Sequence, residues 1–252
     1  MRVLLTNDDG IFAPGINALA ESLSKVAEVF IVAPATEQSG ASQAITVHQP
    51  IRVDEYKLLD SKIKAWMIGG TPADCVKIGL AKLLDVQPDL VVSGINLGAN
   101  LGTDVLYSGT VSAAREGAMH GIKSIAISLD VRRNPNFLAA AAFMQRFVPS
   151  FLEKNVDDHL LLNINVPANW TLEQGKISFT KLGIRKYENA FEKRLDPSGR
   201  SYYWMGGTLA KSENSADTDV AAVGNGELAI TPIHFDLTDQ NLLNKLKNIK
   251  FM

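Results

Sequence analysis

Short apolar runs alternate with helical patterns over the first two-thirds of the chain. Each run stops at polar or helix-breaking residues and predicts a buried strand; the runs fall at residues 2–6, 28–33, 89–93, 124–128 and 160–166. Between them apolar residues recur at helical spacing. The first such segment starts at Pro14, a favourable first-turn residue, and places on one face Ile16, Leu19, Ala20, Leu23 and Val26. Strands alternating with helices predict an α/β fold with a doubly wound, mostly parallel sheet covered on both faces.

Two runs, Ile51–Tyr56 and Ile63–Ile68, interrupt this repeat and predict an antiparallel pair inserted into it. A helix is expected next, because Thr71 suits the N-cap, Pro72 the first helical position and Asp74 the third. Further helices are expected at residues 109–119 and 137–152.

The pattern weakens after Pro167. Residues 175–215 contain two β-like runs, Lys176–Leu182 and Ser201–Met205, separated by a charged stretch with Pro and Gly. The segment is either a protruding hairpin of the kind that makes oligomer contacts or an ordinary surface loop, and the pattern favours neither. A short helix at 218–222, a strand at 227–232 and an amphipathic helix at 237–246 follow. We expect one domain over residues 1–252, with a core of about 1–170 and a hairpin and C-terminal oligomerisation extension over about 171–252.

The composition is that of an ordinary globular chain, with 46% hydrophobic and 21% charged residues and a formal net charge of −2 over 252 residues. This charge gives no reason to expect binding to nucleic-acid polymers or to anionic membranes. The single Cys75 excludes an intramolecular disulfide and a thiolate metal cluster. No apolar stretch approaches 18 residues and no basic-then-apolar leader precedes the first strand, so we expect a cytoplasmic protein.

Two adjacent acids, Asp8 and Asp9, stand where the first predicted strand ends. Burial makes neighbouring carboxylates costly to ionise unless a cation lies between them, and hard oxygen ligands favour Mg²⁺ or Mn²⁺. Gly10 lets the backbone bend, so that both acids can turn toward one point. A turn in which one Asp caps the next helix would explain one acid, whereas a metal site explains the pair.

Three loops follow three predicted strands, at residues 7–13, 35–43 and 94–108, and in a doubly wound fold they meet at the carboxyl edge of the sheet. Their oxygen donors suit Mg²⁺ or Mn²⁺ rather than structural Zn²⁺ and include Asp8, Asp9, Ser39, Ser42, Asn96, Asn100 and Asp104. Taken alone, the segment of Ser39 and Ser42 is better explained as a flexible polar loop. Only its placement beside Asp8 favours a ligand role.

A second candidate is Ser108-Gly109-Thr110, where a predicted helix begins. The free N–H groups and the dipole of a helix N-terminus suit a phosphate, and the two hydroxyls add donors. Alone, the same residues would be explained as a plain N-cap. A metal site at the same edge of the sheet makes a phosphate seat the better interpretation.

A series of ordered motifs runs through the chain: Thr6-Asn7-Asp8-Asp9-Gly10, Ser39-Gly40, Gly70-Thr71-Pro72-Ala73-Asp74-Cys75, Ser93-Gly94-Ile95-Asn96, Tyr107-Ser108-Gly109-Thr110-Val111, Asp217-Thr218-Asp219 and Thr231-Pro232. Together they make the chain similar to the SurE (stationary-phase survival protein) nucleotidase family. The resemblance covers essentially the whole chain and is densest over residues 1–130.

This resemblance implies a Rossmann-like core and a phosphatase that acts on nucleoside 5′- and 3′-monophosphates, with some members also trimming short polyphosphate. It also implies homodimers or homotetramers that exchange C-terminal elements. One Mg²⁺ or Mn²⁺ per subunit would be held by the residues that match the family's ligands, Asp8, Asp9, Ser39 and Asn96. The phosphate would contact the matching loop of Ser108, Gly109 and Thr110, with Asn96 beside it. The family often has basic residues just before the Ser-Gly pair, where this chain has Thr36-Glu37-Gln38, which argues against strong anion steering.

We therefore expect a 5′-nucleotidase that takes nucleoside monophosphates and uses a metal-polarised water to attack phosphorus, with Asp8 or Asp9 accepting a proton from that water. The alternative is a receiver-like signalling domain that binds Mg²⁺ without turnover. Receivers also place paired acids after their first strand, but they need a phosphorylatable Asp at the end of a central strand, where this chain has Val92-Ser93-Gly94. A metal-dependent glycosyltransferase is a third possibility, but the acids at the end of the first predicted strand are an adjacent pair and not the Asp-x-Asp motif of such enzymes.

Overall fold

The computed structural model describes residues 1–57, 63–130, 135–154, 160–189, 191–210 and 212–249. The described residues form a nine-stranded sheet with the strand order β3-β4-β2-β1-β5-β6-β7-β13-β8. Its central strands run parallel and coincide with the predicted apolar runs: β1 (Arg2–Thr6), β2 (Glu28–Pro34), β5 (Leu90–Leu97), β6 (Ser124–Asp130) and β7 (Leu161–Pro167). Both faces of these strands are covered, which explains why their sequences are almost continuously apolar.

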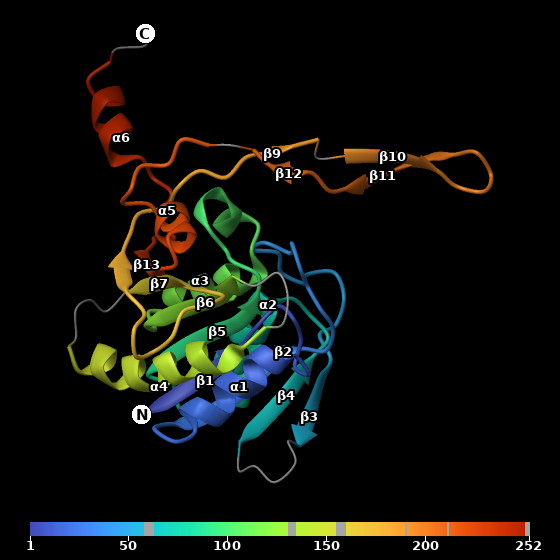
Figure 1. Ribbon diagram of the computed structural model, residues 1–252. Helices are drawn as coiled ribbons and strands as arrows, with labels where there is room; N and C mark the ends of the chain where they lie inside the picture. The colour runs from blue at the N-terminus through green and yellow to red at the C-terminus, as the bar shows by residue number, and fades with distance from the viewer. Residues whose placement is uncertain (58–62, 131–134, 155–159, 190, 211, 250–252) are drawn as a thin grey trace.

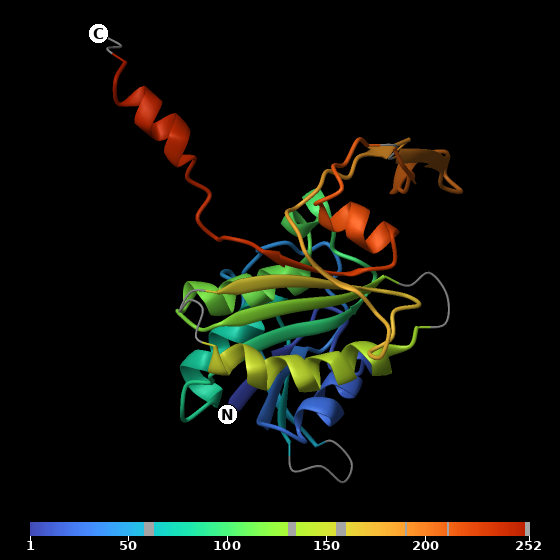
Figure 2. The same ribbon diagram turned by 60° about the vertical axis from the view of Figure 1, so that its left-hand side comes forward.

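Helices cover the two faces of the sheet (Figures 1 and 2). On one face α1 (Pro14–Leu23) and α4 (Phe137–Glu153) pack over a core that includes Leu5 and Leu19. The predicted helical face is wrong at Val26, which lies beyond the end of α1 and is 37% exposed.

The other face of the sheet is covered by α2 (Pro72–Ile78), its π-helical continuation η1 (Gly79–Leu83) and α3 (Gly109–Met119). The predicted capping box starts α2. The Thr71 hydroxyl accepts from the Asp74 N–H at 3.1 Å, and the Asp74 carboxylate accepts from the Thr71 N–H at 2.9 Å.

The two edges of the sheet depart from a parallel arrangement. At one edge β3 (Val53–Lys57) and β4 (Lys64–Ile68) form the predicted antiparallel pair, and β4 joins β2 in parallel. At the other edge β13 (Leu228–Pro232) runs antiparallel to β7 and pairs with the short β8 (Ile177–Phe179). The α/β fold with a mostly parallel sheet is thus confirmed, with mixed edges.

The segment after Pro167 is a protruding hairpin, so the surface-loop alternative is wrong. Its strands are β10 (Phe191–Leu195) and β11 (Ser201–Met205), and a smaller pair, β9 (Tyr187–Glu188) and β12 (Thr208–Leu209), lies nearer its base. The predicted run Lys176–Leu182 belongs to the main sheet instead, as β8.

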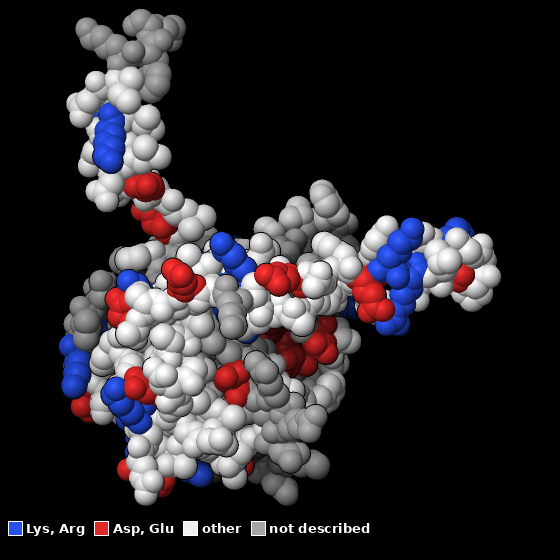
Figure 3. All heavy atoms as spheres, turned by 45° about the horizontal axis from the view of Figure 1, so that its top comes forward, with Lys and Arg blue, Asp and Glu red and all other residues white. Residues whose placement is uncertain are grey.

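The C-terminal part packs only partly on the body. Its first helix, α5 (Asp219–Gly224), buries Ala222 and Val223. The last, α6 (Gln240–Leu246), buries no residue and stands clear of the sheet, as does the β10–β11 hairpin (Figures 2 and 3). In the described part of the chain, none of the helices has the length and apolar character needed to cross a bilayer.

Candidate metal and phosphate site

The carboxyl end of β1 brings Asp8 and Asp9 to the edge of the sheet, between β5 and the start of α3. Asp8 is 5% exposed, and its Oδ1 accepts a hydrogen bond from the Thr110 hydroxyl. Gly109 leaves no space on the other side, since a Cβ there would lie 2.7 Å from the Cβ of Asp8. Oδ2 of Asp9 accepts from the Leu97 N–H at 3.1 Å. Residues from three separate segments therefore meet around the two acids.

The surroundings of Asp8 and Asp9 disfavour their ionised forms. Burial raises the pKa of Asp8, while hydrogen bonds from the Thr110 hydroxyl and N–H oppose that rise. Burial first, and the charge of Asp8 second, raise the pKa of Asp9 to about 6. Within the described ranges, no Lys or Arg forms an ion pair with either acid. The two acids therefore have no basic partner in the described part of the chain that would offset their negative charge.

The loop after β2 packs directly against this pair. The Gln38 N–H donates to the carbonyl of Asp8 at 2.7 Å. Gly10 suits the turn between the two segments because its φ of +96° is a backbone conformation that other residues rarely adopt. Ser39, the residue after Gln38, is thereby placed at the same edge as Asp8.

Glu37 is a third carboxylate at this edge. It accepts a hydrogen bond from the Ser39 hydroxyl, with 2.6 Å between Oγ and Oε1. Its negative charge also adds to the rise in the pKa of both Asp8 and Asp9. On the face turned forward in Figure 3, acidic side chains gather in a recess below the hairpin.

Asn96 approaches from β5, which continues to Leu97, four residues past the predicted strand end at Ser93. The pairing of β5 with β6 shifts register between Ser93 and Asn96. The Asn96 amide nitrogen donates to the carbonyl of Gly98 at 2.7 Å, which fixes the amide plane and turns Oδ1 away from Gly98. Because Leu97 bonds Asp9, Asn96 stands beside the acidic pair.

Ser108 caps α3, since its Oγ accepts from the Val111 N–H at 3.1 Å. Thr110 is fully buried, and its hydroxyl is taken by Asp8. Ser108 is therefore the N-cap of α3, as the alternative interpretation of this segment predicts. Asp8 also accepts a hydrogen bond from the first turn of the helix. The positive end of α3 nevertheless faces the acids, which leaves Ser108 and Gly109 at the rim of the site.

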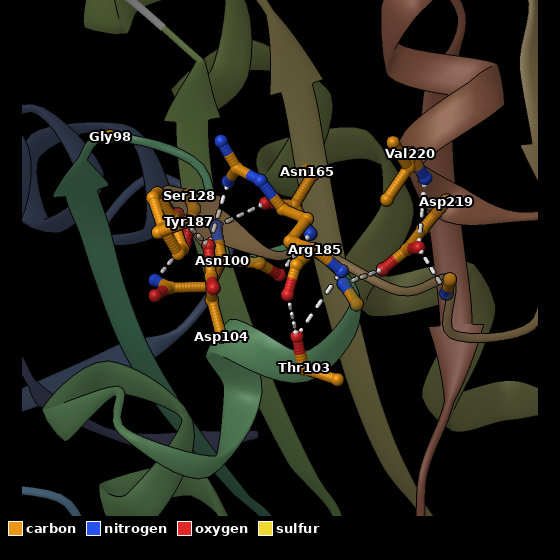
Figure 4. A network of polar contacts seen from close by, with 12 residues as sticks. Gly98, Asn100, Thr103, Asp104, Ser128, Asn165, Arg185, Tyr187, Asp219 and Val220 are labelled. Carbon is orange, nitrogen blue, oxygen red and sulfur yellow. Dashed lines mark hydrogen bonds and ion pairs between the residues drawn. The ribbon is translucent and has the colours of Figure 1, made fainter. Parts of the chain in front are cut away.

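A buried network holds the loop of residues 98–108 in place (Figure 4). Asn100 donates its N–H to Asn165 and its side-chain amide to Ser128, each at 2.8 Å. Its carbonyl accepts from the amides of Asn163 and Asn165 at 2.8 and 3.0 Å. Asn100 is thus engaged in supporting the loop rather than open to a ligand.

The base of the hairpin is tied to the same loop (Figure 4). Asp104 accepts from Nη1 of Arg185 at 2.8 Å and from the Tyr187 hydroxyl at 2.7 Å. The fully buried Asp219 accepts from the N–H groups of Gly102 and Gly183, both at 2.8 Å. Two of the oxygen donors counted from the sequence, Asn100 and Asp104, are therefore used inside the protein, and Ser42 likewise donates to the carbonyl of Leu106 at 2.7 Å.

The sequence analysis gave no role at the site to four residues that lie around it or support its loops: Glu37, Arg185, Tyr187 and Asp219. Glu37 carried a usable signal, because it stands two residues before a serine already considered as a ligand. Arg185 and Tyr187 lie far along the chain from Asp104, and nothing in the local pattern joins them.

The donor chemistry at the edge of the sheet fits a hard divalent cation. A cation would offset the charge of two carboxylates that have no ion-pair partner among the described residues. Ser39 and Asn96, which carry neutral oxygens, each adjoin a residue whose N–H bonds one of the acids, Gln38 at Asp8 and Leu97 at Asp9. Among the residues that the structure describes, no group of three or more His, Cys, Asp or Glu side chains converges as a ligand set. A site here would therefore need neutral oxygen ligands in addition to Asp8 and Asp9.

Comparison with known proteins confirms the resemblance. A family model described as survival protein SurE matches residues 3–189. The chain is 52% identical over 252 residues to the 5′-nucleotidase SurE of Carboxydothermus hydrogenoformans. That alignment covers 98% of this chain and 95% of the other protein. It is 50% identical over 250 residues to the 5′-nucleotidase SurE of Pelotomaculum thermopropionicum, across 99% of this chain and 95% of that one.

The same likeness extends to three dimensions. The crystal structure of the SurE protein from Aquifex aeolicus superposes with a TM-score of 0.84 at 39% identity, and the match covers 98% of each chain. The structural match therefore extends beyond residue 189, where the match to the family model ends.

Proposed function

This chain belongs to the SurE family, and on that basis we propose that it hydrolyses nucleoside 5′- and 3′-monophosphates with the help of one divalent metal ion. Its activity is that of a 5′-nucleotidase, a phosphoric monoester hydrolase. The observation that supports the metal most directly is the pair of a buried Asp8 and a partly buried Asp9, for which the described residues supply no ion-pair partner; burial first and the charge of Asp8 second raise the pKa of Asp9 to about 6. A signalling receiver without turnover is not favoured, because a 5′-nucleotidase relative matches nearly the whole chain.

We assign the binding of Mg²⁺ or Mn²⁺ to Asp8, Asp9, Ser39 and Asn96. When bound, the ion would neutralise charge on the phosphate and lower the pKa of a water. The protein holds this site by rigid contacts. Asp8 is fixed by Thr110, and Asp9 by the Leu97 N–H. Such fixation matters because misplacing reacting groups by about 1 Å can cost on the order of 100-fold in rate.

The phosphate is assigned to the N-terminus of α3, at Ser108 and Gly109, with Thr110 beneath them and Asn96 alongside. The helix dipole would stabilise the added negative charge of the transition state, and the Gly109 N–H is the first-turn donor we assign to it, because the N–H groups of Thr110 and Val111 already bond Asp8 and Ser108. Asp9 is the more accessible acid of the pair, and for that reason we assign to it the acceptance of a proton from the attacking water. These groups address metal and phosphate rather than sugar, which supports action on both 5′- and 3′-monophosphates.

Phosphate release from AMP by metal-stripped protein tests the proposal. We expect turnover after addition of Mg²⁺ or Mn²⁺ and little with excess chelator. Equal rates in both conditions would refute metal dependence. Stoichiometric labelling of an Asp by a phosphodonor, without turnover, would refute the phosphatase and support a receiver.

We also propose self-association as a homodimer or homotetramer. The hairpin strand β11 exposes Tyr203, Trp204 and Met205 to 60%, 59% and 77%, and α6 exposes Leu242 to 50%. Apolar side chains grouped in this way on projecting elements favour burial against another copy. Light scattering of the intact chain should give a dimer or tetramer, and Trp204→Glu should lower the association constant; a monomer at all concentrations would refute this proposal.

A further inference from the structure

Glu37 lies against the proposed metal site without being one of its assigned ligands. Its Oε1 accepts from the Ser39 hydroxyl across 2.6 Å. Backbone contacts fix the loop that carries both residues, because the neighbouring Gln38 N–H donates to the carbonyl of Asp8. A Cβ on Gly10 would lie only 3.6 Å from the backbone nitrogen of Glu37, so the loop is held close to the turn that bears the acids.

This hydrogen bond decides which way the Ser39 oxygen faces. A hydroxyl has one proton and two lone pairs. With its proton given to Glu37, the lone pairs of Ser39 are left for another partner. Without Glu37, the Ser39 hydroxyl could donate its proton to a carboxylate of the acidic pair, and its lone pairs would then turn away from a shared cation.

The negative charge of Glu37 also acts on the two acids of the site. It contributes to the rise in the pKa of both Asp8 and Asp9, after the larger effect of burial. Yet the described residues include no ligand group of three carboxylates, so Glu37 does not join the pair directly. Its position is that of a carboxylate behind a ligand.

We propose, on the basis of the function proposed above, that Glu37 is a positioning residue that orients the Ser39 hydroxyl toward the divalent cation. Its carboxylate holds the hydroxyl proton and adds negative charge behind the ligand. Partners of this kind typically change metal affinity by about 10–100-fold when removed. Glu37 thus favours binding of the cation and does not attract the incoming phosphate.

Binding of Mn²⁺ to the metal-stripped full chain, followed by electron paramagnetic resonance, measures this role without turnover. We expect Glu37→Ala to raise the Kd for Mn²⁺ about tenfold. Glu37→Gln keeps an acceptor but loses the charge, and should raise the Kd by a smaller factor. The control is Glu21→Gln, an exposed glutamate on α1, which should bind as the parent does.

A double-mutant cycle with Ser39→Ala isolates the route of the effect. If Glu37 acts through Ser39, the double variant should bind Mn²⁺ within about twofold of Ser39→Ala alone. Full additivity, or a Glu37→Ala variant within twofold of the parent, would overturn the inference. Failure of the proposed function looks different: Asp9→Asn would then bind Mn²⁺ as tightly as the parent.

Discussion

Replacing Gly109 by Ala tests how strictly the start of α3 positions Asp8. Gly109 is the first residue of α3, and its backbone is compatible with Ala. Space is the obstacle. An added Cβ would lie 2.7 Å from the Cβ of Asp8 and 2.9 Å from its Oδ2. Carbon atoms in contact prefer about 3.5–4.0 Å, so Asp8 and the helix must separate by roughly 0.8 Å or more.

That displacement is large for a ligand and modest for the fold. A shift of about 1 Å at a catalytic group can cost on the order of 100-fold, so we expect kcat/KM to fall by about 10–100-fold. Overpacking costs about 1–3 kcal/mol, and the better helix propensity of Ala returns up to about 1 kcal/mol. With that gain returned in full the net cost is about 0–2 kcal/mol, so for a chain of this size Tm should drop by at most about 8 °C.

The assay compares AMP hydrolysis at saturating Mg²⁺ with thermal unfolding of the same samples. Gly224→Ala is the matched control, because a Cβ there meets nothing within 4 Å. It should keep both activity and Tm. A Gly109→Ala enzyme with kcat/KM within twofold of the parent would show that Asp8 tolerates movement and would refute the reasoning.

Three further outcomes follow from the same geometry. Asp9→Asn should remove most turnover at saturating metal while circular dichroism stays unchanged; near-normal rates would defeat the ligand assignment. Asp9 has a pKa of about 6 when folded and 3.8 as its ordinary value, so without metal its contribution to stability is full below about pH 4 and is lost as the pH rises through 6. The gain in Tm on adding Mn²⁺ should therefore be larger at pH 7.5 than at pH 5, and equal gains would contradict a site that competes with protons. Asp219→Asn places an amide NH₂ against the N–H of Gly102 or Gly183 and should lower the free energy of unfolding by about 3 kcal/mol. Tm should then fall by roughly 6–12 °C. An unchanged Tm would show that this buried acid does not hold the loop.

The central sheet and its covering helices could be predicted from the sequence because burial imposes a pattern. Strands such as β1 and β7 are buried on both faces and read as unbroken apolar runs. The start of α2 was visible because its capping box is local, from Thr71 to Asp74.

The sequence could not decide between a hairpin and a surface loop after Pro167 for the opposite reason. Strand β10 is exposed along its whole length and contains Glu192, Lys193 and Arg194, so no face of it is selected to be apolar. Its partner β11 coincides with the predicted run Ser201–Met205, but the other predicted run, Lys176–Leu182, is not the second strand of this hairpin. A strand without a buried face carries little periodic signal.

The residues of the candidate site also fall into two groups, those with a signal in the local sequence and those without one. Asp8 and Asp9 stand out locally, since two acids at a strand end are costly without a cation. The supports around them are contacts between distant segments. Asp104 meets Arg185, and Gly102 meets Asp219, only once the chain has folded. Local spacing cannot reveal such pairs.

The most direct test of the account is an anomalous difference map from a crystal of this protein grown with abundant Mn²⁺. The account predicts one strong peak per subunit between the carboxylates of Asp8 and Asp9, with oxygen atoms of Ser39 and Asn96 at about 2.0–2.3 Å from it. A map with no peak there, in which the two side chains point apart, would contradict it.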